Sequence, residues 1–317
     1  SESFWFRSLF KIKLYEASGE SFQRLFQDIM SYRCPDFQSV APYQGDGGND
    51  GWIPGEKRYF QVYGKKADSE QNLPYILKKA REDFEKLKNH WGMIERYHFV
   101  YNDRFEGAPA PIGQTLLKLQ KAHNLIEANV WVGAKLEQLF TELSRDQKEA
   151  ILHSVPADLP EFIDSRAVGE ILSYLADKVS NFSDLLTQTA PDFDEKIKIN
   201  GLAGPVPNFL RSDSYQTQDV DDFLQRRDFG LKQAISEEMR ALYQESCAKI
   251  PDREVKCGNL RYVWMVEQLI PPKTKEHPHT FKVYRGAARV VLAKYFEACD
   301  IYEHPSTITT PQTYSLF

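Results

Sequence analysis

Cysteine is scarce in this sequence, and its spacing excludes two classes of small fold. Four cysteines occur among 317 residues, and none of them forms a CxxC pair. Zinc ribbons and disulfide frameworks both depend on closely and regularly spaced cysteines. We therefore expect reduced thiols packed in the protein, at Cys34, Cys247, Cys257 and Cys299.

Long apolar runs and leader patterns are also missing. No stretch reaches the roughly 18 apolar residues that mark a membrane-spanning helix. The first residues, SESFWF, lack the basic-then-apolar order of a secretory signal. These features predict a cytoplasmic protein with no membrane association. Walker A, GxSxG and HExxH sequences are absent as well, which leaves little support for a metabolic enzyme.

An excess of positive charge is absent too. The 40 Lys and Arg residues are outnumbered by 45 Asp and Glu, giving a net charge of -5. Attraction to phosphate needs clustered basic side chains, so this chain is not coated in nucleic-acid-binding surface. What the sequence does contain is 42% hydrophobic residues, enough for packed cores, and its length predicts two domains.

The pattern of predicted elements breaks once along the chain. Before the break, hydrophobic spacing gives the order α-β-β-β-α-β-α-β-α, which predicts an α/β domain with a mixed central sheet flanked by helices over residues 1–153. Prolines at 156 and 160 mark a linker over about 154–164. Beyond it no convincing strand pair follows, so residues 165–317 are predicted to form a mostly α-helical interaction domain.

Individual elements follow from the same spacing. A helix over residues 20–30, with Ser18 as its N-cap, places five apolar residues on one face: Phe22, Leu25, Phe26, Ile29 and Met30. A small β-meander surrounds a Gly/Asp-rich turn at 45–51. Strands are predicted at 37–42, 58–63, 97–101 and 126–132, and helices at 73–91, 116–123, 135–143, 166–177, 219–250 and 281–298.

The turn GDGGNDG at 45–51, followed by the strand YFQVY at 59–63, carries the most informative chemistry. Hydrolysis of a phosphodiester needs oxygen ligands for Mg²⁺ and a lysine beside the attacking water. Asp50 and Gln61 on adjacent strands would supply two ligands, and a backbone carbonyl near Val62 a third. The glycines tighten the turn and would give a DNA backbone close access. A plain hairpin turn, with Asp46 shaping it, is the alternative.

A helix bearing Glu20, the turn ending in Asp50 and the strand bearing Gln61 resemble the PD-(D/E)xK restriction-endonuclease fold of the Mrr-like group. The resemblance covers about residues 14–103 and implies a nuclease core of αβββαβ order. It implies that Asp50 and Gln61 bind Mg²⁺ or Mn²⁺, that Glu20 is the acidic residue of the first helix, and that DNA is the substrate. Glu20 in a first helical turn also suits a capping role.

The lysine position departs from that family. Tyr63 stands two residues after Gln61, where the family has lysine. Lys65 points to the same face if the strand continues, and it is the first substitute. If Gly64 ends the strand, a different lysine completes the site or contacts DNA: Lys66, Lys78 or Lys79. A centre without any lysine is the second hypothesis, a DNA-binding or scaffolding subunit in place of an enzyme.

The whole chain also resembles the nuclease-bearing component of bacterial ABC-three-component, or Lamassu-type, anti-phage systems. The residues that carry this resemblance are Asn200 to Leu202, Phe209 to Gln216, Ala293 to Glu303 and Tyr97 to Asp103. It implies an SMC-like ABC ATPase partner, a small middle subunit and a nuclease held inactive until invading DNA is sensed. Self-association of the chain is left open.

Overall fold

The computed structural model describes residues 2–41, 47–65, 72–154, 164–178, 192–227, 229–298 and 300–305. The chain divides into two compact units, Lys13–His153 and a second made of Ser1–Ile12 with Ser154–Phe317. The division after residue 153 falls where the sequence predicts it. The residues before Lys13 group with the C-terminal segment, however, whereas the sequence prediction began the first domain at residue 1.

A five-stranded mixed sheet forms the centre of the N-terminal unit, with the strands in the order β1-β2-β3-β4-β5. Strands β1 (Gln38–Ser39), β2 (Gly51–Ile53) and β3 (Arg58–Tyr63) are antiparallel neighbours. Strands β4 (Arg96–Tyr101) and β5 (Glu127–Trp131) continue the sheet parallel to β3. The predicted α/β class and mixed sheet are therefore confirmed.

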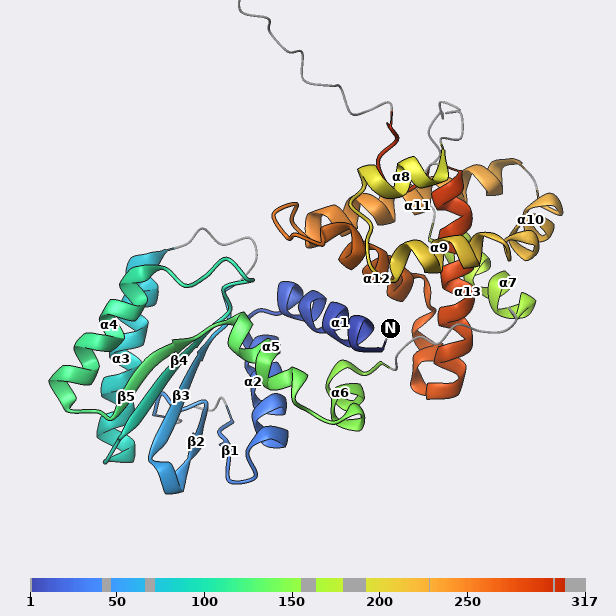
Figure 1. Cartoon of the computed structure of the whole chain (residues 1–317). Coiled ribbons are helices and arrows are strands. Elements are labelled where there is room, and N and C mark those ends of the chain that lie inside the picture. The colour runs from blue at the N-terminus through green and yellow to red at the C-terminus, as the bar shows by residue number, and fades with distance from the viewer. Residues whose placement is uncertain are drawn as a thin grey trace, which may run out of the picture. The chain divides into compact units, whose positions relative to one another are not determined.

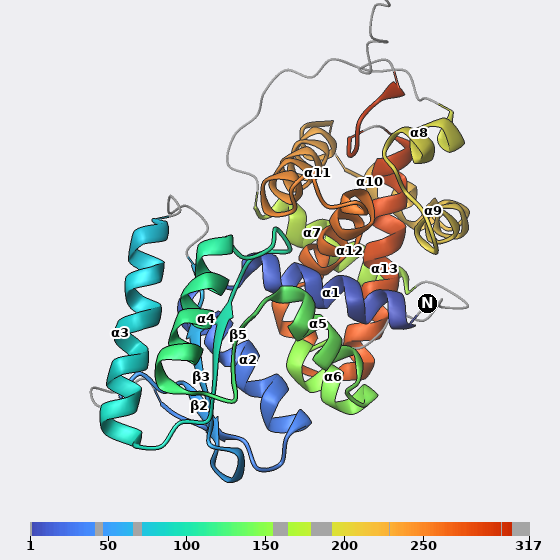
Figure 2. The same cartoon turned by 60° about the vertical axis from the view of Figure 1, so that its left-hand side comes forward.

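Helices cover both faces of this sheet (Figures 1 and 2). Helices α3 (Leu73–Trp91) and α4 (Ala110–His123) pack on the face that carries Tyr59, Tyr97 and Phe99. Helix α2 (Gly19–Arg33) packs on the opposite face, where the ring centroids of Phe26 and Phe60 lie 5.2 Å apart. Helices α5 (Gly133–Thr141) and α6 (Arg145–Leu152) end the unit.

Local sequence explains most of these elements. Ser18 caps α2 as predicted, and its backbone N–H donates to the Ser21 hydroxyl. All five apolar residues predicted for one face of α2 are buried. The predicted bounds of β3 and α3 match the observed ones. The predicted strand at 37–42 is wrong in length, because β1 spans only Gln38–Ser39; Pro42 lies outside the described residues.

The described residues of the C-terminal segment are mostly helical and include no strand, as predicted. After α1 (Glu2–Glu16), most of which groups with it, come α7 (Ser165–Ala176), α8 (Phe193–Ile199), α9 (Val206–Ser214), α10 (Gln218–Gln225), α11 (Phe229–Lys249), α12 (Cys257–Leu269) and α13 (Pro278–Glu297). Two short 3₁₀ helices occur in the chain, Pro54–Glu56 and Pro272–Glu276. Among the described residues, no helix is long and apolar enough to cross a membrane.

Candidate functional site

The turn before β2 places Asp50 at the rim of the sheet. Gly47 and Gly48 adopt φ angles of 65° and 77°, in the left-handed region that favours glycine. The Asn49 side chain then accepts a hydrogen bond of 3.0 Å from the Gly51 backbone N–H. Asp50 follows with only 7% of its surface exposed. Gly45 and Asp46 lie outside the described residues.

Hydrogen bonds to α2 and β3 fix Asp50. Its Oδ2 accepts from the Val62 backbone N–H at 2.7 Å, and its Oδ1 accepts from the Gln23 amide at 2.9 Å. The backbone carbonyl of Asp50 accepts from the Gln27 amide at 2.8 Å. Gln23 and Gln27 are one turn apart on α2, so that helix holds both the side chain and the backbone of Asp50.

Asp50 contacts β3 on either side of Gln61. Its backbone N–H donates to the Phe60 carbonyl at 3.0 Å, and its Oδ2 accepts from the Val62 backbone N–H. Gln61 is 5% exposed, and within the described part of the chain its Oε1 atom has no hydrogen-bond partner. A buried amide oxygen left unpaired is costly. The Gln61 oxygen is therefore a buried acceptor available to a cation or a donor.

A lysine of α3, Lys79, interacts electrostatically with Asp50. Lys79 lies 2.9 Å from the Asp83 carboxylate. Burial alone lowers the pKa of Lys79, but its contact with Asp83 outweighs burial and raises that pKa, and the charge of Asp50 adds to the effect. The charge of Lys79 also lowers the pKa of the Tyr63 phenol, against the larger effect of burial, which raises it. Tyr63 is the residue at the family's lysine position. A helix lysine thus lies close to the place where the strand lysine was expected.

The other candidate lysines are placed differently. Strand β3 ends at Tyr63, so the condition on which Lys65 was predicted, a continuing strand, is not met. Gly64 follows the strand and packs tightly against the backbone of α2: a Cβ at this position would lie 2.6 Å from the Gly19 nitrogen. Lys78 is exposed and pairs with Glu82 at 3.6 Å. Lys66 lies outside the described residues.

Asp83 is a site residue that sequence reasoning missed. It is only 3% exposed, although the charges that follow Arg81 suggested a solvated helix face. Its carboxylate contacts Lys79 and also Lys86, the latter at 3.3 Å. Its position in the sequence carried a signal, since Asp83 follows Ile76 and Ala80 at the spacing of the buried helix face. A carboxylate on an apolar stripe points to a specific partner.

Gly47 and Gly48 of the turn face α3. A Cβ at Gly48 would lie 2.6 Å from the Asp83 carbonyl oxygen, and one at Gly47 would lie 2.8 Å from the His90 Cβ. Both glycines are buried. The prediction that they give DNA close access is therefore wrong for these two positions, because their lack of a Cβ serves the packing of the turn on the helix.

Glu20 lies at the same end of the sheet. The Gly19 backbone N–H donates to the Gly64 carbonyl at 2.8 Å, so the first turn of α2 adjoins the end of β3. Glu20 is exposed, and it precedes Gln23 by three residues on α2. That spacing puts the two side chains on one helix face. Glu20 therefore belongs to the helix face that holds Asp50.

The donor set fits a hard divalent cation. No group of three His, Cys, Asp or Glu in the described ranges could hold a metal ion, which excludes a zinc-like cage there. Magnesium instead takes oxygen ligands, usually one or two carboxylates, and keeps several waters. Asp50 offers a carboxylate and Gln61 an unpaired amide oxygen. The Val62 carbonyl points to the Asp50 side of β3, because the N–H of the same residue does.

Comparison with known proteins bears on the C-terminal segment. Residues 166–303 match the family model described as C-terminal domain 10 of the ABC-three component (ABC-3C) systems. No curated protein and no solved structure matches the chain. The family match supports membership of an ABC-three-component defence system.

Proposed function

We propose that this chain is the metal-dependent DNA endonuclease of an ABC-three-component anti-phage system and that its helical C-terminal domain regulates it. One observation carries the proposal: Gln61 has a buried, unpaired oxygen on β3, and it lies between Phe60 and Val62, the two β3 residues whose backbone groups bind the buried Asp50. A purely structural hairpin gains nothing from such an oxygen, since leaving it unpaired costs stability. A residue that binds a cation, in contrast, must have an oxygen that is not already paired within the protein.

Mg²⁺ or Mn²⁺ would be held by Asp50, Gln61 and the Val62 carbonyl. When bound, the ion polarises the phosphate and lowers the pKa of a coordinated water. The chain's own groups prepare the site: Val62 and Gln23 fix the carboxylate of Asp50 through hydrogen bonds of 2.7 and 2.9 Å. This fixed geometry stabilises charge that develops on the phosphate without reorganisation.

Lys79 takes the role of the missing strand lysine in this proposal. The contact with Asp83 keeps the amine protonated, because it raises the pKa of Lys79. A cationic amine beside Asp50 would stabilise the phosphate oxygens and orient the attacking water. Lys78, exposed on the same helix, would contact the DNA backbone as a solvated cation, together with Lys66. Glu20 would act at the edge of the site.

The second candidate is a nuclease fold that has lost catalysis and binds DNA, or serves as a scaffold, for an SMC-like ABC ATPase. The arrangement of Asp50 supports this alternative, because both of its carboxylate oxygens already accept hydrogen bonds within the protein. The substitution of Tyr63 for the expected lysine supports it too. In both candidates, the ATPase and a small middle subunit would bind the helical domain.

Cleavage by the assembled complex decides between these candidates. Purified full-length chain, with and without the ATPase and middle subunit, is incubated with plasmid DNA and Mg²⁺ or Mn²⁺. We expect metal-dependent cleavage that Asp50→Asn abolishes while the fold persists. Cleavage that survives in Asp50→Asn, in a preparation free of contaminating nuclease, rejects the enzyme; DNA binding without any cleavage supports the scaffold.

Lys79→Met and Lys78→Met form a matched pair for the lysine. Both side chains lie on α3 and both pair with an acidic residue four positions later, Lys79 at 2.9 Å and Lys78 at 3.6 Å. We expect Lys79→Met to lower the cleavage rate about a hundredfold or more, the scale of a lost catalytic group. Lys78→Met should weaken DNA binding only slightly. Equal effects of the two substitutions would remove Lys79 from the mechanism.

A further inference from the structure

Helix α13 buries two arginines one turn apart, Arg285 and Arg289, and neither is exposed at all. Each guanidinium uses one edge for a carboxylate. The Arg285 Nε donates to Glu267 at 2.8 Å, and Arg289 donates through Nε and Nη2 to both oxygens of Asp213, at 3.0 and 3.1 Å. On both residues, the remaining Nη1 group has no hydrogen-bond partner within the described residues.

Two more buried donors without an acceptor lie in the same layer. The Trp5 ring is 5.1 Å from the Arg285 guanidinium and 6.3 Å from the ring of Phe209. Phe209 in turn lies 4.2 Å from the Arg289 guanidinium and 6.4 Å from the ring of Tyr262. Among the groups that the structure describes, the Trp5 indole N–H finds no hydrogen-bond partner. The Tyr262 oxygen interacts with Arg289, which can only donate, so the Tyr262 hydroxyl proton has no acceptor.

All four groups are donors, which limits what satisfies them. Arginine and tryptophan nitrogens only donate, and burial raises the pKa of the Tyr262 phenol, so its proton stays in place. A water molecule would bring two further donors of its own into a layer that already lacks acceptors. An anion only accepts. Buried donors in native proteins are nearly always paired, with an ion or water where the protein offers nothing.

The local charge balance also favours an anion. The Lys275 amine contacts this layer, because it donates to the Glu267 carbonyl at 2.8 Å and interacts electrostatically with Arg285. Three cations, Arg285, Arg289 and Lys275, therefore face two carboxylates, Glu267 and Asp213. The excess is one positive charge, and a buried charge needs a counter-charge.

We propose that the C-terminal unit binds a small monovalent anion between α13, α12 and the start of α1, held by Arg285, Arg289, Trp5 and Tyr262. This site is independent of the proposed nuclease centre, since none of its residues belongs to that centre. An anion here would join the first residues of the chain to the helical domain, because Trp5 lies on α1 and its three partners lie on α12 and α13.

Bromide serves as the probe, because its anomalous scattering identifies it. Crystals of the full chain soaked in sodium bromide are expected to show an anomalous peak within hydrogen-bond distance of the two Nη1 groups. In solution, bromide at constant ionic strength against gluconate should slow hydrogen exchange of the α13 amides with a saturating dependence. Absence of the peak, or density for water alone, overturns the proposal.

Two nearly isosteric variants extend the test without removing an arginine. Trp5→Phe and Tyr262→Phe each delete one donor, and each should raise the bromide midpoint about tenfold, the effect of one hydrogen bond to a charged group. Tyr302→Phe is the control, because its hydroxyl already donates to the Gly258 carbonyl at 2.7 Å; its midpoint should equal that of the wild type. The same midpoint in all four proteins means a general salt effect and overturns the site.

Discussion

Acidification should destabilise the N-terminal unit through a single buried histidine. His98 on β4 is fully buried, and its ring lies 5.2 Å from that of Phe60 and 4.9 Å from that of Trp131. Its Nδ1 bonds to the Asn129 side-chain oxygen, and its Nε2 lies 2.9 Å from the Arg58 Nη1. Since arginine can only donate, Nε2 accepts and the neutral ring is favoured. His98 is therefore a packed core residue.

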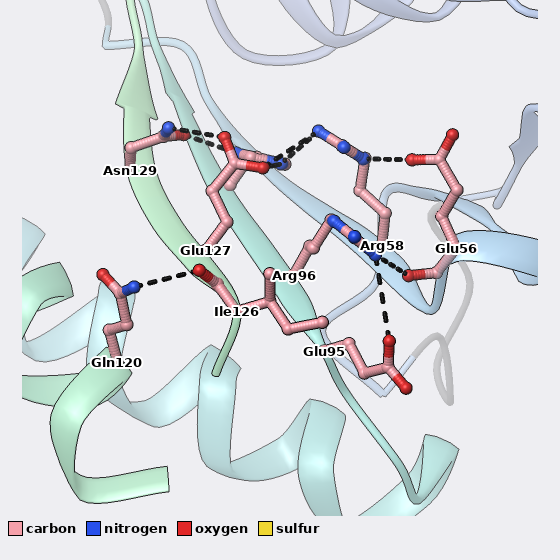
Figure 3. A network of polar contacts seen from close by, with 9 residues as sticks. Glu56, Arg58, Glu95, Arg96, Gln120, Ile126, Glu127 and Asn129 are labelled. Atoms are coloured by element: carbon pink, nitrogen blue, oxygen red, sulfur yellow. Dashed lines mark hydrogen bonds and ion pairs between the residues drawn. The ribbon is translucent and has the colours of Figure 1, made fainter. Parts of the chain in front are cut away.

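Charges surround this ring at the sheet edge where β3, β4 and β5 begin. Arg58 contacts both the Glu56 carboxylate and the His98 ring. Figure 3 shows Arg58 beside Glu56, with Glu127 and Asn129 on β5 and with Arg96 bonded to the Glu56 carbonyl. Burial is the main reason that the pKa of His98 falls from 6.5 to about 4; Asn129 and Glu127 oppose the fall, and Arg58 and Arg96 favour it. Protonation would place a second cation against Arg58.

The size and the sign of the effect follow from linkage. Between pH 6.5 and about 4 the unfolded chain holds a proton on His98 that the folded chain lacks, so stability falls as the pH falls through this window. The difference of about 2.5 pH units corresponds to about 3 kcal/mol when the whole window is crossed. Above pH 6.5 the contribution is fully present.

Hydrogen exchange of the β4 amides measures this effect within one unit of a two-unit chain. We expect protection in the wild type, corrected for intrinsic exchange, to drop between pH 6.5 and 4. His98→Phe keeps the stack with Phe60 and Trp131 and removes the titration, so most of this drop should disappear. An equal drop in wild type and His98→Phe would refute the assignment.

Two further predictions concern the candidate site. Gly48→Ala should lower the free energy of unfolding by about 1–3 kcal/mol, because a positive φ is unfavourable for alanine and the added Cβ would lie 2.6 Å from the Asp83 carbonyl oxygen. Thermal unfolding measures this loss, with Gly55→Ala as the control, since a Cβ at Gly55 meets nothing within 4 Å. Similar losses in the two variants would contradict the prediction. Asp83→Asn should lower the pKa of Lys79, since Asp83 raises it, and so shift the alkaline limb of the cleavage profile to lower pH; an unmoved limb would mean that Lys79 does not titrate in the reaction.

Periodicity predicted the elements whose two faces differ. Helix α3 has one buried and one exposed face and the predicted bounds. Strand β3 also has the predicted bounds, although its four central residues are all buried, because Gly64 follows its last residue. Helix α12 was missed for the opposite reason: ten of its 13 residues are buried, including Asn259 and Arg261. A helix enclosed on all sides has no polar stripe to reveal its period.

The site was predictable only where neighbours in sequence decide it. Asp50 and Gln61 are joined by a short hairpin, and Asp50 binds the β3 backbone at Phe60 and Val62, on either side of Gln61. The lysine depended on a tertiary contact, since β3 ends where Gly64 meets the backbone of α2. Lys79 and Asp83 reach the site because α3 packs on the turn, and spacing within α3 alone does not show what that helix packs against.

Manganese binding tests the central claim, that Asp50 and Gln61 share one divalent cation. Electron paramagnetic resonance of Mn²⁺ titrated into the full chain counts bound ions directly. We expect one site in the wild type that competes with Mg²⁺ and is lost in both Asp50→Asn and Gln61→Met, while the exposed control Asp36→Asn keeps it. No bound ion in the wild type, or equal binding in all four proteins, would contradict the account.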